Sequence, residues 1–205
     1  MSLRREFLEA WRRSDADERS QMAVDVASVG RADLLAVIGY LKYPLTIRDG
    51  MLLWVAASGL HVEAVDYLLN AADFDQYALK RACLSAGQAW LKGMHDNPRE
   101  CARCGRSIIK MLIEKSRREL HKRTYIDAVE TASADLLREA SFHGALDMVN
   151  FFLEETELGL RHAFAAVLMA EKARRVAVID RFIDAGFDPS PFHELVMSKA
   201  LSESP

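Results

Sequence analysis

The sequence predicts an all-α chain built from repeated pairs of helices. Ala and Leu dominate its apolar residues and runs of β-branched residues are scarce, which favours helix over strand. All five prolines fall between segments with helical apolar spacing. Five apolar segments of similar pattern begin at residues 34, 64, 108, 148 and 178. The first and last steps between them are both 30 residues, and the steps in the middle are longer.

Length and composition describe a globular chain of ordinary size. The 205 residues are 50% apolar and 28% charged, with a net charge of -3, which suits one domain, 1–205, with a buried core. The longest apolar run, Ala163–Ala170, is too short to cross a bilayer. Three cysteines and a charged N-terminus without an apolar signal segment favour a reducing compartment. We therefore expect a cytoplasmic protein, or one delivered into a host cytosol, that binds neither membrane nor nucleic acid.

Residues 1–18 are expected to form an N-terminal capping helix. Leu3, Phe7, Leu8 and Trp11 lie at helical spacing with Arg and Glu between them. Such a helix would cover the exposed core of the first repeat, as the terminal units of repeat proteins require. A helix on a membrane surface is the alternative, although the apolar stripe is short and the charges are mixed.

Four of the apolar segments follow a shorter helical pattern that is rich in small residues. These first helices read VDVASVG at 24–30, LWVAASG at 53–59, LKRACLSAG at 79–87 and LREASFHG at 137–144. Their alanines would allow a partner helix to approach closely, and their glycines suit the left-handed residue that ends a helix. The unit is therefore a short helix, a tight turn and a longer apolar helix.

The second unit, LLWVAASGLHVEAVDYLLNAADFD, resembles an ankyrin repeat. Leu60 stands where that family has glycine, although Gly59 is adjacent. The residues that fit the family pattern in register are Leu53, Ala56, Ala57, His61, Val65, Leu68 and Leu69. The fourth unit fits through Leu137, Ala140, Gly144, Met148, Val149, Phe152 and Leu153.

Residues 184–193, DAGFDPSPFH, mark the seam between two repeats in this resemblance. DAGFDP is similar to the end of an ankyrin repeat, and SPFH matches the T-P-L-H opening of the next, with Ser190 and Pro191 placed to start a helix. The resemblance implies a curved solenoid in which His61 and His193 tie turns together by hydrogen bonds. It assigns repeats one and two to 22–75, an interrupted repeat three to 76–115, an insertion to 116–133, and repeats four, five and a terminal half-repeat to 134–201.

The third repeat is interrupted by QAWLKGMHDNPRECARCGR. We expect these residues to add one extra helix or loop, with a helix that starts at Pro98 because Asn97 and Glu100 form a capping pair. Insertions of this kind lie at one edge of a stack and leave it intact. In the later insertion the residues that could form one helical stripe are Leu120, Tyr125, Ile126 and Val129.

CARC at 101–104 is the motif closest to a metal or redox site. A structural zinc site needs four ligands, and the nearest further candidates are His95 and Cys83, with His121 or Asp96 as substitutes. A zinc-stabilised regulatory module that uses Cys83, His95, Cys101 and Cys104 is therefore one alternative. Two half-buried thiols on a helix are the simpler interpretation, and we expect no metal or cofactor.

No P-loop, G-x-G-x-x-G, H-E-x-x-H or G-x-S-x-G motif occurs. We therefore expect no enzyme, and an unfamiliar site in the inserted region is the remaining alternative. The stretch KSRRELHKR at 115–123 could receive an acidic partner surface through Arg117, Arg118, Lys122 and Arg123. A solvated helix end is the alternative, and the lack of interleaved aromatic residues argues against nucleic acid.

The resemblance implies a non-catalytic protein–protein interaction scaffold or adaptor, in the role of an effector or a specific protein inhibitor. We expect a monomer that binds another protein through the concave face, because such a face is extended and rigid. Core packing is the alternative role for Trp54 and Phe142. The residues expected to contact the partner lie at first-helix ends and inter-repeat turns: Val29, Trp54, Ser58, Leu84, Ser85, Phe142 and His143, with Phe187 and Asp188 at the final tip.

Overall fold

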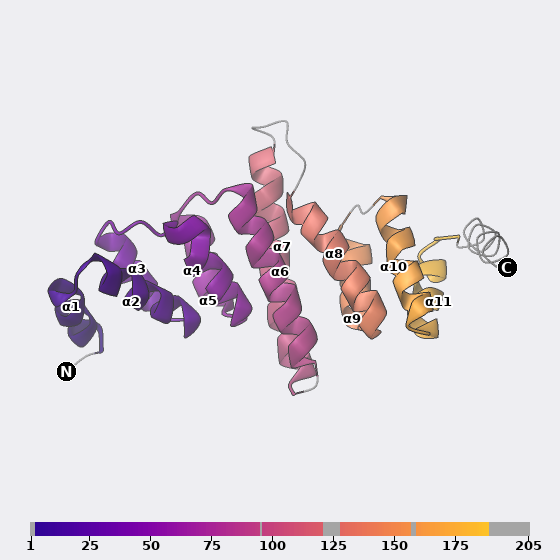
Figure 1. Cartoon of the computed structure of the whole chain (residues 1–205), viewed down its shortest axis with the longest axis horizontal. Coiled ribbons are helices and arrows are strands. Elements are labelled where there is room, and N and C mark those ends of the chain that lie inside the picture. Colours follow the sequence, from indigo (N-terminus) through magenta and orange to yellow (C-terminus); the bar gives the residue numbers. More distant parts are fainter. Residues whose placement is uncertain (1–2, 95, 121–127, 157–158, 189–205) are drawn as a thin grey trace, which may run out of the picture. The chain divides into compact units, whose positions relative to one another are not determined.

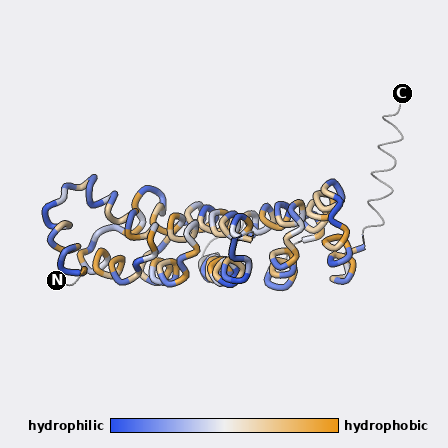
Figure 2. The backbone as a smooth tube through the Cα atoms, turned by 90° about the horizontal axis from the view of Figure 1, so that it is seen from below, coloured by the Kyte–Doolittle hydropathy of each residue, from blue (hydrophilic) through white to orange (hydrophobic). Residues whose placement is uncertain are grey.

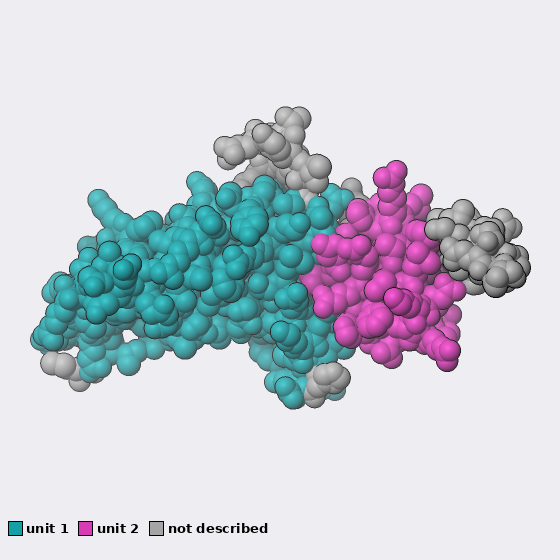
Figure 3. Space-filling view, viewed as in Figure 1, with its two compact units in different colours: residues 1–132 teal, residues 133–205 magenta. Residues whose placement is uncertain are grey.

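The chain is helical throughout the part that the structure describes, as the sequence predicts. The computed structural model describes residues 3–94, 96–120, 128–156 and 159–188, and these contain eleven helices and no strand. The chain groups into two compact units, residues 1–132 and 133–205 (Figure 3). No described helix is long and apolar enough to cross a membrane.

Most helices are 9–13 residues long, whereas α6, α7 and α8 have 18, 23 and 16 residues. Helix α8 includes the boundary between the two units. The helices are α1 (Leu3–Arg13), α2 (Ala16–Ser28), α3 (Ala32–Tyr40), α4 (Ile47–Ser58), α5 (Val62–Ala71), α6 (Gln76–Gly93), α7 (Pro98–Leu120), α8 (Ala128–His143), α9 (Leu146–Glu155), α10 (Leu160–Lys172) and α11 (Val176–Asp184) (Figure 1).

Several helices begin where the sequence supplies a cap. Asp15 accepts a hydrogen bond from the backbone N–H of Glu18 (2.9 Å), and the Glu18 carboxylate accepts one from the N–H of Asp15 (3.0 Å), so α2 starts with a capping box. Asp75 accepts a hydrogen bond from the N–H of Ala78 (2.8 Å) at the start of α6. Helix α7 starts at Pro98, as predicted.

The helices of the first unit form two rows. Helices α2, α4 and α6 pack side by side in the first row, and α3, α5 and α7 pack side by side in the second (Figures 1 and 2). Each first-row helix also packs against the helix that follows it in sequence. Small residues allow helices to pack this closely. The first-row helices contain six inaccessible alanines of this kind: Ala23, Ala27, Ala56, Ala57, Ala82 and Ala86. In the second unit α9 and α10 both pack against α11.

The same turn joins four of the helix pairs. At the end of α2, the N–H of Arg31 donates to Val26 O (3.1 Å) and the N–H of Gly30 donates to Ala27 O (3.1 Å), which is a Schellman motif. The equivalent bonds end α4, α8 and α10. The turn residue has a positive φ each time, at Gly30 (71°), Leu60 (55°), Gly144 (75°) and Arg174 (56°). Within each unit these residues are 30 positions apart, which is the step found in the sequence.

The third helix pair differs from the predicted unit. The turn expected at Gly87 is absent, because α6 continues through this buried residue to Gly93. The residues expected to add a separate helix or loop instead lengthen α6 and α7. The lengthened parts of α6 and α7 pack closely against each other. Trp90 of α6 is inaccessible, and a Cβ on Gly105 of α7 would come within 2.9 Å of the Trp90 Cβ.

Helix α1 packs through Trp11, which is 5% exposed. The Trp11 ring lies edge-on to Tyr43, with centroids 5.1 Å apart, and the Arg19 side chain donates to the Trp11 carbonyl oxygen (3.0 Å). Leu3 is 53% exposed and Phe7 and Leu8 are half-buried, so Trp11 is the one buried residue of the predicted apolar stripe. The predicted single helix over 1–18 is wrong in its extent, because α1 ends at Arg13 and α2 begins at Ala16.

Helix α4 begins with unusual backbone. Arg48, Asp49 and Gly50 have φ values of 48°, 56° and 77°, in the left-handed region that is costly for residues other than glycine. Gly50 is buried, and a Cβ there would lie 2.5 Å from the Cβ of Ala78 on α6. The start of α4 therefore lies directly against α6.

Two predicted features lie outside the described residues. The SPFH opening at 190–193 and the terminal half-repeat follow residue 188, and the stripe in the later insertion includes Tyr125 and Ile126 within the undescribed segment 121–127.

Candidate interaction surface

The residues predicted at first-helix ends are accessible beside the shared turns. Val29, after α2, is 63% exposed, and Ser58, the last residue of α4, is exposed. Phe142 is 37% exposed and His143 is exposed at the end of α8, where their rings lie edge-on with centroids 5.3 Å apart. These four residues have the accessibility that a binding role requires.

Trp54 lies half-buried in the middle of α4, between the core and the surface. The guanidinium carbon of Arg81, on α6, is 4.3 Å from the centroid of its ring, a cation–π contact. Its Nε1 atom is buried and has no hydrogen-bond acceptor among the described residues. Trp54 therefore contributes to packing and also supports a charged side chain at the surface.

Leu84 and Ser85 lie in the interior of α6 and not at a helix end. The helix continues past Gly87 to Gly93, and both residues are half-buried. This position corrects the prediction that placed them beside a turn. They share the helix with Tyr77, which is 58% exposed, and with Arg81. The sequence analysis did not identify Tyr77 and Arg81. The helical spacing of Tyr77, Arg81, Leu84 and Gln88 could have indicated that they share one face of the helix.

Phe187 and Asp188 lie at the end of the described chain. The N–H of Phe187 donates to Phe182 O (2.9 Å), their ring centroids are 6.1 Å apart, and Gly186 has a φ of 84°. Phe187 is half-buried and Asp188 is exposed. The predicted final tip is therefore a turn of the same kind as those between the paired helices.

Hydrogen bonds connect successive turns within each unit. His61 Nε2 donates to Ser28 O (2.8 Å) in the preceding turn, which is the tie that the ankyrin resemblance predicted. Arg175 occupies the equivalent position in the second unit, where its Nε donates to Phe142 O (3.2 Å). Both bonds join residues 33 positions apart. A Cβ on Gly30 would come within 2.5 Å of the His61 ring, so glycine at this turn also leaves room for the tie.

Replacing His61 or Arg175 with Ala is expected to lower the free energy of unfolding by about 0.5–1.5 kcal/mol, because each change removes one hydrogen bond between turns. Urea unfolding followed by circular dichroism measures the effect. His143→Ala is the matched control, since it removes an exposed histidine that makes no tie between turns. If all three variants unfold at the wild-type urea concentration, the ties do not stabilise the stack.

Two of the four basic residues predicted to receive an acidic partner are described. Arg117 and Arg118 are exposed near the end of α7, and Arg118 lies 3.5 Å from a carboxylate oxygen of Glu114. Lys122 and Arg123 lie outside the described residues. Arg117 and Arg118 are therefore accessible, and Glu114 on the same helix partly balances the charge of Arg118.

A polar recess of about 290 Å³ lies between α5 and α7. Asp66, Asp73, Lys115 and Arg118 are among its lining residues, and Lys115 Nζ is 3.6 Å from Asp73 Oδ1. Glu114 is a third acidic lining residue beside the two basic ones, so side chains of both charges are mixed in the recess.

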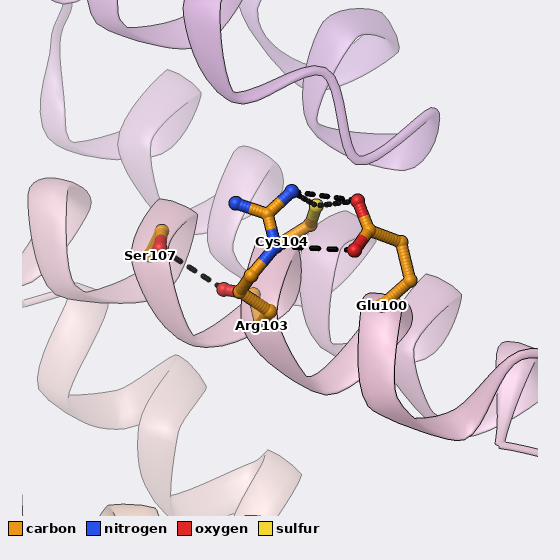
Figure 4. A network of polar contacts seen from close by, with 4 residues as sticks. All are labelled: Glu100, Arg103, Cys104 and Ser107. Carbon is orange, nitrogen blue, oxygen red and sulfur yellow. Dashed lines mark hydrogen bonds and ion pairs between the residues drawn. The ribbon is translucent and has the colours of Figure 1, made fainter.

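Cys104 is buried on α7 and belongs to a polar network with the exposed residues Glu100 and Arg103 (Figure 4). Its thiol donates to Glu100 Oε1 (3.4 Å), and Arg103 donates to both oxygens of the same carboxylate (2.6 and 3.1 Å). Burial and the hydrogen bond to Glu100 raise the pKa of Cys104, and the bond from Arg103 lowers the pKa of Glu100. The Cys104 thiol therefore stays protonated at neutral pH, whereas metal binding and nucleophilic attack need the thiolate.

The cysteines of the alternative zinc site do not gather in one place. A Cβ on Gly93 would touch Cys101 Sγ, at the junction of α6 and α7, whereas Cys83 is buried ten residues earlier in α6, about 15 Å away along the helix. His95 lies outside the described residues. Within the described part of the chain, no group of three or more His, Cys, Asp or Glu could hold a metal ion.

Comparisons with known proteins assign no family to the chain. No protein-family model matches the sequence, and no curated protein and no solved structure gives a significant match. The candidate interaction surface therefore depends on the residues and geometry described above.

Proposed function

We propose that the protein is a cytoplasmic, ankyrin-like scaffold that binds another protein without catalysis. It acts as a monomer and contacts its partner through the first-helix ends, the shared turns and the exposed faces of the first helices. The recurrence of one turn carries this proposal, because the same hydrogen bonds and positive φ return after 30 residues in each unit. A repeated turn presents side chains from successive helices on a rigid surface, which reduces the ordering cost of binding.

The composition of the exposed helix ends supports the same function. Phe142 and His143 are accessible on a helix end that is connected to the next turn by the Arg175 hydrogen bond. Aromatic side chains that are held in place before binding are common carriers of binding energy in protein interfaces. The first unit presents Val29 and Ser58 at the corresponding ends of α2 and α4.

The double substitution of Phe142 and His143 by Ala is expected to weaken partner binding by about 1 kcal/mol or more, while the fold is retained. The wild-type chain is used to capture its partner from a native lysate, and the affinity of the purified partner is then measured for each variant by calorimetry. Leu160→Ala with Arg161→Ala is the matched control, because both residues are exposed at the start of α10. Equal affinity of all three proteins would contradict the proposed surface.

A further inference from the structure

Positive charge is concentrated on the third helix pair. Helix α6 contains Lys80, Arg81 and Lys92 and has no Asp or Glu among its 18 residues. Residues 76–120 contain ten Lys or Arg and four Asp or Glu, whereas the rest of the chain contains 17 and 26. A basic segment therefore lies within a protein whose net charge is -3, and this separation of charge favours an acidic partner for that segment.

Arg81 is the cation of α6 that is best placed to bind an anion. Its side chain is exposed and lies over the Trp54 ring, and it makes no hydrogen bond or ion pair with any described residue. Arg103, by contrast, is paired with Glu100 at 2.6 Å. The aromatic ring restricts the guanidinium, and its N–H donors are left for a carboxylate.

Apolar side chains flank Arg81 on the same face of α6. Tyr77 is one turn before it and is 58% exposed, and Leu84 is one turn after it and is half-buried. Lys80 adds a second, partly exposed positive charge. Trp, Tyr and Arg are the residues that most often carry the energy of protein interfaces, so a partner would meet apolar contacts on both sides of a cation.

We propose that this face of α6, formed by Tyr77, Lys80, Arg81 and Leu84 together with Trp54 of α4, binds an acidic segment of a partner protein. The inference rests on the scaffold function proposed above and names its partner chemistry. A carboxylate of the segment pairs with Arg81, and neighbouring apolar side chains of the segment contact Tyr77 and Leu84. A protein fits better than nucleic acid, because affinity for nucleic acid depends on many phosphate contacts in succession and the remainder of the chain is acidic.

The test uses a fluorescent peptide of about twelve residues in which Glu alternates with Leu, and a Lys–Leu peptide as the opposite-charge control. Fluorescence anisotropy measures binding to the full chain. The Glu–Leu peptide is expected to bind the wild type, with about fivefold weaker binding to Arg81→Gln and about tenfold weaker binding to Arg81→Glu. Lys80→Gln is expected to weaken binding about twofold without altering the contact between Arg81 and Trp54. Arg4→Glu on α1 makes the same charge change as Arg81→Glu and should leave the affinity unchanged.

Thermal unfolding confirms that each variant is folded, and Arg81→Gln keeps the length of the side chain while it removes the charge. The proposal is overturned if the Glu–Leu peptide does not bind, if it binds no better than the Lys–Leu peptide, or if the Arg81 variants bind it as well as the wild type. Tighter, Arg81-dependent binding of an oligothymidylate would also overturn it and would assign the face to nucleic acid. If the captured partner still depends on Phe142 and His143, the scaffold function remains and only this site is lost.

Discussion

Replacing Trp90 with Ala is expected to lower the free energy of unfolding by about 3–5 kcal/mol, the usual cost of removing a fully buried aromatic side chain. Trp90 is inaccessible and lies against Gly105, where α6 and α7 approach so closely that a Cβ on the glycine would contact the indole ring at 3.0 Å. The cavity left by the substitution could close only if α6 and α7 moved closer to each other. Urea unfolding followed by far-UV circular dichroism measures the loss.

This prediction distinguishes the observed packing from the insertion expected from sequence. A loop at the edge of the stack would tolerate the loss of Trp90 with little change in stability. Tyr77→Ala is the control, because this aromatic residue lies on the same helix but is 58% exposed. Similar, small effects of the two substitutions would show that the lengthened ends of α6 and α7 do not belong to the core.

Replacing Gly50 with Ala is expected to destabilise the protein by about 3 kcal/mol, because strain and overpacking act together. The residue has a φ of 77°, and its new methyl group would lie 2.5 Å from the Cβ of Ala78, an atom fixed to the backbone of α6. The start of α4 would therefore have to move away from α6. The measurement is again the free energy of unfolding in urea.

Gly186→Ala separates the two causes. Gly186 has a similar φ of 84°, but nothing lies within 4 Å of the position that its Cβ would occupy. It should therefore show only the cost of the left-handed backbone, about 1 kcal/mol. If Gly50→Ala is no worse than Gly186→Ala, the contact between the start of α4 and α6 is not close in solution.

Only two of the glycines expected to end the first helices, Gly30 and Gly144, adopt the left-handed conformation that local sequence predicted. Gly59, the glycine expected to take this role in the second unit, has a φ of -86°, and the left-handed residue there is Leu60. Leu60 and Arg174 adopt this φ without being glycine, at the positions 30 residues after Gly30 and Gly144. The accessible positions of Val29, Ser58, Phe142 and His143 follow from the turns, so this part of the candidate surface could be read from sequence.

The sequence by itself determined the all-α class, the helix start at Pro98 and the 30-residue step, because helix propensity, caps and glycine turns act over a few residues. Only the tertiary structure decided that α6 continues through Gly87. A glycine inside a helix costs about 1 kcal/mol, and burial against the neighbouring helices offsets it here. Tertiary structure also placed Arg81 over Trp54, a contact between residues 27 positions apart on different helices. A contact of this kind depends on how two helices pack, and no pattern within either helix encodes it.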